Sequence, residues 1–112
     1  KGRGLEKSLM GIVGLETAFP VLYTDLVREG IISLEKLVEL MSVSPAERFG
    51  LESGIKAGAI ADFCVYNLEE KYVINPDDFL SMGKATPFEG FEVFGRNLLT
   101  VHNSKTVFNY QF

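Results

Sequence analysis

The sequence predicts an α+β fold in which helices come first and strands follow. Up to residue 53 apolar residues recur every three or four positions, the period of a helix with one buried face. From residue 54 onward, glycine-containing turns separate short runs of β-branched and aromatic residues, which is typical of strands. Helices followed by strands indicate an α+β protein, or pieces of two domains joined in sequence.

Residues 1–10 are polar and glycine-rich and are expected to form an entry loop. Such a start indicates that the chain is a fragment or a processed piece of a longer protein. The first helix follows, with its apolar face built from Leu15, Phe19, Leu22, Leu26 and Val27. Gly30 comes after the last of these and is suited to end the helix in a left-handed conformation. Ser33 is a good N-cap for a second helix, and Glu35 lies in its first turn, where the helix dipole favours an anion.

A third, short helix is predicted to start at Ser44. This serine would cap the helix, Pro45 would take the first helical position, and Glu47 would complete a capping box. Gly50 would end the helix after little more than one turn.

The second part of the chain is predicted to contain short strands and one helical turn. Asn75 followed by Pro76 repeats the cap-plus-proline pattern and predicts the turn, which extends to Leu80. Asn103 and Ser104 are expected to join the last two strands in a hairpin. The predicted strands are 61–67, 72–74, 91–94, 98–102 and 106–110.

The composition excludes several classes of function. Hydrophobic residues make up 46% of the 112 residues and charged residues 23%, which is a globular composition. The net charge is −4 and Lys and Arg are scattered, whereas a nucleic-acid interface needs clustered positive charge. No apolar run approaches the roughly 18 residues of a membrane span. We therefore expect no nucleic-acid partner, no membrane association and a cytoplasmic location.

Side chains that carry chemistry are scarce. A metal site needs several converging His, Cys or carboxylate ligands, and the chain has one His, His102, and one Cys, Cys64. Cys64 lies in an apolar run and is expected to be buried, whereas His102 is expected to be a solvated imidazole. Glu16 should interact with the dipole of the first helix, Asp62 should be a turn or strand-edge residue, and Asp77–Asp78 should belong to a helix start. No residue of the chain is predicted to be catalytic or to bind a metal.

The strongest functional candidate is a stretch of backbone. Gly11 and Gly14 frame a β-branched pair, and the chain then passes directly into a helix. Glycines at such a corner allow the backbone to approach another molecule closely before it turns.

Several motifs, in the same order, resemble those of bacterial dihydroorotases of the amidohydrolase superfamily. Residues 11–17 (GIVGLET) resemble the segment that follows the family's last metal-binding motif. Residues 41–51 are similar to the family pattern MS.NPA..FGL, residues 54–62 to the turn G.I..G..AD, and residues 86–90 to NTPF.G. Hydantoinases and allantoinases share the G..AD turn, so a related cyclic amidase is an alternative, against which GIVGLET argues.

The resemblance implies a zinc-dependent TIM-barrel hydrolase that interconverts N-carbamoyl-L-aspartate and dihydroorotate in pyrimidine biosynthesis. In that family a metal-bound hydroxide attacks the ring amide while an Asp moves the proton. The zinc ligands and that Asp are expected upstream of Lys1, so this chain alone should hold no zinc and be inactive. Residues 1–53 would be the end of the barrel, with its last helices, and residues 54–112 would be strands of a small C-terminal β-sandwich.

The resemblance also assigns two substrate-binding residues, Met10 and Gly11, which would contact the small-molecule substrate through the backbone. The chain has Met10 where the family often has Phe, and Ser44, Ala85 and Ser104 where it often has Asn, Asn and Gly. Serine tolerates positive φ less well than glycine, so the hairpin at Ser104 should be slightly weakened.

A non-enzymatic interaction module is the other alternative. Without the remaining strands of barrel and sandwich, such a piece would expose apolar edges. A homodimer or another association through these edges is therefore expected.

Overall fold

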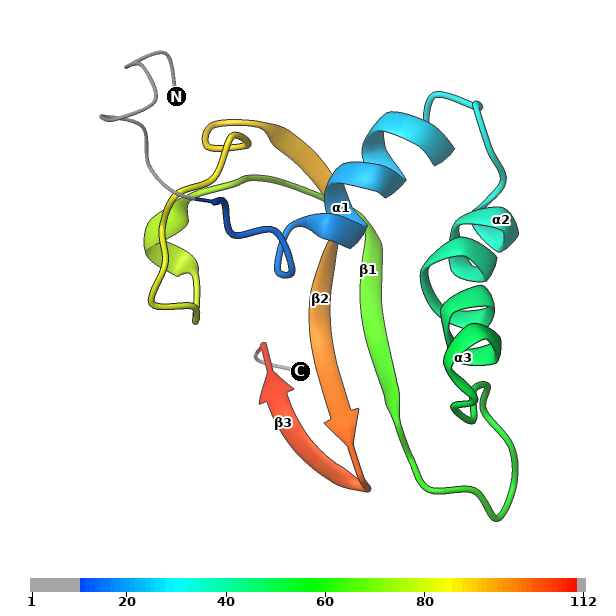
Figure 1. The fold of residues 1–112 in the computed structure, drawn as a ribbon. Coiled ribbons are helices and arrows are strands. Elements are labelled where there is room, and N and C mark those ends of the chain that lie inside the picture. Colours follow the sequence, from blue (N-terminus) through cyan, green and yellow to red (C-terminus); the bar gives the residue numbers. More distant parts are fainter. Residues whose placement is uncertain (1–10, 111–112) are drawn as a thin grey trace.

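The computed structural model describes residues 11–110 and confirms the α+β architecture. Helices are followed by a three-stranded antiparallel sheet of order β1-β2-β3, and α1 lies across the sheet (Figure 1). The helices are α1 (Ala18–Leu22), α2 (Leu34–Val38) and α3 (Ser44–Phe49), with π-helical turns η1 (Tyr23–Val27) and η2 (Glu39–Val43) and a 3-10 turn η3 (Pro76–Asp78). The strands are β1 (Phe63–Val73), β2 (Glu92–His102) and β3 (Lys105–Asn109).

The first helix comprises α1 and η1 and ends where the sequence predicts. At η1 the helix widens, since the N–H of Arg28 donates to the carbonyl of Tyr23, five residues earlier, at 3.0 Å. Gly30 has a φ of +74°, and its N–H donates to the carbonyl of Val27 at 3.0 Å. A left-handed glycine therefore terminates this helix, as predicted.

The second helix is continuous from Leu34 to Phe49, so the prediction of a separate third helix is wrong. Ser44 has helical dihedral angles, φ −63° and ψ −45°, and no side-chain cap precedes α3. Pro45 lacks an N–H, and its ring crowds the carbonyl four residues earlier in a regular α-helix. The wider turn η2 ends two residues before the proline and lets the helix continue past it. Gly50, with a φ of +66°, ends the helix as predicted.

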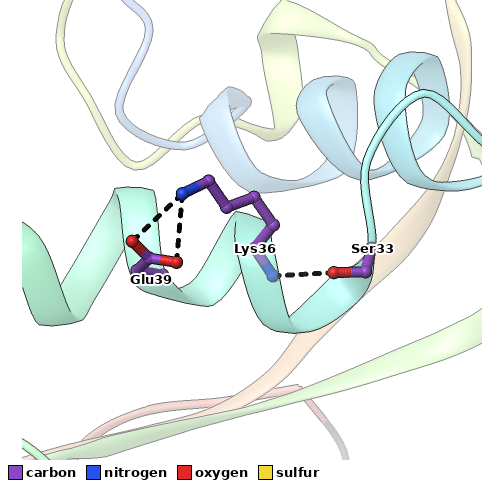
Figure 2. Close-up of polar contacts among 3 residues, drawn as sticks. All are labelled: Ser33, Lys36 and Glu39. Carbon is purple, nitrogen blue, oxygen red and sulfur yellow. Dashed lines mark hydrogen bonds and ion pairs between the residues drawn. The ribbon is translucent and has the colours of Figure 1, made fainter.

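Ser33 caps this helix as predicted (Figure 2). Its hydroxyl oxygen accepts a hydrogen bond from the N–H of Lys36 at 3.1 Å, which stabilises the helix by about 1 kcal/mol. The Lys36 ammonium extends along the helix to the Glu39 carboxylate, with distances of 3.0 and 3.1 Å (Figure 2). Both side chains are half exposed, so this ion pair adds only about 0.3–0.5 kcal/mol.

Each of the two long strands replaces two predicted short strands. Between β1 and β2 the register shifts after Asn67, which pairs with Arg96, because the next pair is Lys71 with Phe94. The extra residues of β1 form a bulge, which the Asn67 side chain stabilises by accepting from the N–H groups two and three residues later, at 3.0 and 3.3 Å.

The bulge lies opposite Gly95, on which the first helix packs. Gly95 has a φ of +95°, and a Cβ added there would lie 3.2 Å from Cε1 of Phe19. The Phe19 ring stacks on Tyr23, with centroids 5.9 Å apart, and contacts Tyr66 at 4.1 Å. The absence of a side chain at Gly95 therefore lets an aromatic cluster join α1 to the sheet.

The hairpin between β2 and β3 is confirmed. Asn103 and Ser104 have φ values of +50° and +62°, as in the two-residue turn with both residues left-handed. The N–H of Ser104 donates to the carbonyl of Ala61 at 2.9 Å, and the N–H of Asn103 donates to the Asp62 carboxylate at 2.6 Å. Nδ1 of His102 lies 3.2 Å from the same carboxylate, with the imidazole 76% exposed. Asp62 is thus a strand-edge residue and His102 is solvated, as predicted.

The described residues leave much apolar surface uncovered. The main buried cluster is small and consists of Val21, Ile74 and Val93. Leu15 and Met82 are 96% and 99% exposed. The radius of gyration is 15.9 Å, whereas a compact domain of this length has about 13 Å. The second helix contacts the rest of the described chain chiefly through η1 (Figure 1).

Candidate functional site

The backbone corner predicted from the sequence consists of residues 11–17. Gly11 is exposed, has a φ of +68°, and has open space around the position of a Cβ. Another residue would be strained in this conformation by about 1–2 kcal/mol. An external molecule can therefore approach the main chain here without meeting a side chain. Met10, the other predicted substrate contact, lies outside the described residues.

Glu16 binds a loop from a distant part of the chain. Its Oε1 accepts from the N–H of Leu80 at 2.9 Å, and its Oε2 accepts from the N–H and hydroxyl of Ser81 at 3.1 and 2.8 Å. Desolvation raises the pKa of Glu16, but these hydrogen bonds and nearby Lys84 outweigh it and hold the pKa below its usual value. The first turn of α1, which begins at Ala18, contains no acidic residue. The predicted role of Glu16 at the helix dipole is wrong, because its carboxylate holds the loop instead.

Two further contacts hold this loop, residues 80–85, against the corner. The N–H of Val13 donates to the carbonyl of Ala85 at 2.9 Å. Gly83 lies so close to Val13 that an added Cβ would be 2.7 Å from Cγ1 of the valine. Sequence reasoning missed the arrangement because 64 residues separate Glu16 from its first partner in the loop, and no local pattern connects them.

A groove of about 680 Å³ opens between the corner, α1 and one face of the sheet. Its lining includes Phe19, Tyr66, Tyr72, Arg96 and Asn97. Burial, with the Cys64 thiol nearby, raises the pKa of Tyr66 to about 12, so its hydroxyl is protonated at neutral pH. The Asn97 amide donates to Oγ1 of Thr100 at 2.9 Å, while its buried Oδ1 has no hydrogen-bond partner among residues 11–110. The groove is therefore aromatic, with one unsatisfied acceptor.

Cys64 is exposed, so the prediction that it is buried is wrong. Its side chain is on the same face of β1 as that of Tyr66, two residues away. Phe19 of α1 covers Tyr66, and Cys64 lies beyond this cover, with its Sγ 3.7 Å from Oγ1 of Thr100. The apolar run around Cys64 predicts burial on both faces, but no described segment covers this end of the sheet.

Residues 11–110 contain no group of three or more His, Cys, Asp or Glu that could hold a metal ion. The zinc that the resemblance implies would be held by residues upstream of Lys1. In the same part of the chain no helix is long and apolar enough to cross a membrane. The described site consists of a backbone corner beside a groove, held by a carboxylate.

No protein-family model matches the chain. Comparison with curated proteins and solved structures does find relatives. The chain is 46% identical over 108 residues to the dihydroorotase of Bacillus cytotoxicus, and the aligned region covers 96% of this chain. It is also 46% identical over 106 residues to the dihydroorotase of Bacillus thuringiensis (strain Al Hakam), and this aligned region covers 94% of the chain. The chain is a homologue of bacterial dihydroorotases. The resemblance that the motifs indicated is thereby confirmed.

This dihydroorotase homologue spans 25% of the length of both curated relatives. Among solved structures, the D-hydantoinase from Bacillus sp. AR9 matches it with a TM-score of 0.72 and 27% identity. That match covers 80% of this chain and 20% of the hydantoinase chain. The chain is therefore similar to a quarter of each dihydroorotase and to a fifth of the hydantoinase.

Proposed function

We propose that the chain is the C-terminal portion of a dihydroorotase, a hydrolase that interconverts N-carbamoyl-L-aspartate and dihydroorotate. The observation that carries this proposal is the 46% identity to dihydroorotases over 94–96% of the chain. Because the chain spans a quarter of these relatives, the activity belongs to the full-length protein that contains it. In this proposal that protein acts in pyrimidine biosynthesis and binds zinc through residues upstream of Lys1.

In this proposal residues 1–53 end the catalytic barrel and residues 54–112 contribute strands to a small β-sandwich. The boundary is supported by the change from helix, which ends at Phe49, to strand, which begins at Phe63. Apolar side chains on the second helix are exposed and suit packing against the rest of a barrel: Val38, Leu40, Met41, Val43 and Phe49. The unsatisfied Oδ1 of Asn97 suits a groove that further chain fills.

The proposed substrate contacts are the backbone groups of Met10 and Gly11. The positive φ of Gly11 and the open space around it support a close approach by the substrate. Since the contact is through the main chain, it does not depend on the Met10 side chain.

A hydantoinase-type cyclic amidase is the second candidate, which the structural match to D-hydantoinase favours. The sequence identity is 27% to that protein and 46% to the dihydroorotases, so dihydroorotase is the better proposal. A non-enzymatic interaction module is the third, and the exposed apolar residues support association of the isolated chain.

The test is an activity assay of the full-length protein and of the 112-residue chain, both supplied with zinc. We expect the full-length protein to form carbamoyl aspartate from dihydroorotate and the 112-residue chain to form none. A zinc-loaded full-length protein that leaves dihydroorotate unchanged would overturn the proposal.

A further inference from the structure

The carboxylate of Glu16 accepts three hydrogen bonds from two consecutive residues. Leu80 supplies its N–H, and Ser81 supplies both its N–H and its hydroxyl, at 2.8–3.1 Å. Hydrogen bonds to a charged acceptor are stronger than those between neutral groups. Both oxygens of Glu16 are therefore directed at the loop.

These bonds fix one end of a second segment that runs beside the corner. The other end is fixed by the hydrogen bond from Val13 to Ala85, and the middle by the close approach of Gly83 to the Val13 side chain. The corner is thus attached to the loop at Val13 and at Glu16. Gly11 lies two residues before the first attachment, so its position follows from how firmly the loop is held.

We propose that Glu16 is a positioning residue, which holds loop 80–85 against the corner and thereby fixes the Gly11 backbone for substrate binding. The identity of the substrate rests on the proposed function, whereas the contact between Glu16 and the loop does not. The carboxylate acts through Val13 and the loop and does not touch the substrate.

Glu16→Gln in the full-length protein tests this role. The amide keeps one acceptor oxygen for Leu80 but presents an NH2 group to Ser81, whose hydroxyl can turn to accept from it, whereas the Ser81 N–H loses its acceptor. We expect the KM for dihydroorotate to rise about fivefold, the ratio that corresponds to about 1 kcal/mol, or one hydrogen bond, with kcat changed less than about twofold. Ser81→Ala, which removes only the hydroxyl, should change KM in the same direction by a smaller factor.

The control is Glu47→Gln, the same change of charge on an exposed residue of α3. It should leave both kinetic constants unchanged. An unchanged KM in Glu16→Gln, or equal effects in the two variants, overturns the positioning role.

Hydrogen exchange gives a readout that does not need activity. In Glu16→Gln the amides of Val13 and Ser81 should exchange faster than in the wild type, whereas in Glu47→Gln they should not. Unchanged exchange refutes the attachment itself. Faster exchange with an unchanged KM refutes the link to substrate binding, and a wild type without turnover refutes the proposed function instead.

Discussion

Gly95→Ala should show how tightly the first helix is seated on the sheet. The φ of +95° strains any residue with a side chain, at a cost of about 1–2 kcal/mol. The new methyl group would also lie 3.2 Å from Cε1 of Phe19 and 3.5 Å from Cδ1 of Tyr23. Because Phe19 packs between Tyr23 and Tyr66, its ring has little room to move, and overpacking of this kind costs about 1–3 kcal/mol. The free energy of unfolding should therefore fall by about 2–5 kcal/mol.

Gly58→Ala provides the matched control. Gly58 has a φ of +84° and no atom within 4 Å of an added Cβ, so it carries the strain without the crowding. Urea unfolding of both full-length variants, followed by circular dichroism, should show Gly95→Ala to be less stable by at least about 1 kcal/mol. Equal stabilities would refute the packing of Phe19 on Gly95.

Two further changes test the corner and the hairpin. Gly11→Val should lower kcat/KM for dihydroorotate at least about tenfold, because the side chain fills the open approach to the backbone. Gly54→Val, with a φ of +89° and equally open space, should not lower it, and equal kinetics of the two variants would exclude a substrate contact at Gly11. Ser104→Gly should raise the free energy of unfolding by up to about 1 kcal/mol. The substitution relieves the strain at φ +62° and loses the hydrogen bond from the Ala61 N–H to the serine hydroxyl. Because this hydrogen bond is exposed, the relief of strain outweighs its loss. A urea midpoint lowered by this substitution would contradict that balance.

Features set by neighbouring residues could be predicted from the sequence. The cap at Ser33, the helix ends at Gly30 and Gly50, and the turn at Asn103 each depend on a few adjacent residues. The continuation of the helix through Ser44 could not be predicted in this way, because its cap-and-proline pattern also fits a wide turn inside a helix.

Features that depend on distant partners were missed. The bulge after Asn67 keeps β1 continuous only because β2 supplies pairs on both sides of Gly95. The exposure of Cys64 depends on where α1 lies on the sheet, which the residues around Cys64 do not encode. For the site, the glycine at position 11 was visible as a candidate, but the partners of Glu16 lie 64 and 65 residues away.

The central proposal is that the full-length protein is a dihydroorotase rather than another cyclic amidase. The most direct measurement is the ratio of kcat/KM for dihydroorotate to kcat/KM for hydantoin, with the same zinc-loaded preparation. We predict a ratio of at least about one hundred, because dihydroorotate carries a carboxylate that hydantoin lacks, and a site built to pair with such a group discriminates strongly against a substrate without it. A ratio of one or below would contradict the claim and assign the protein to the hydantoinase type.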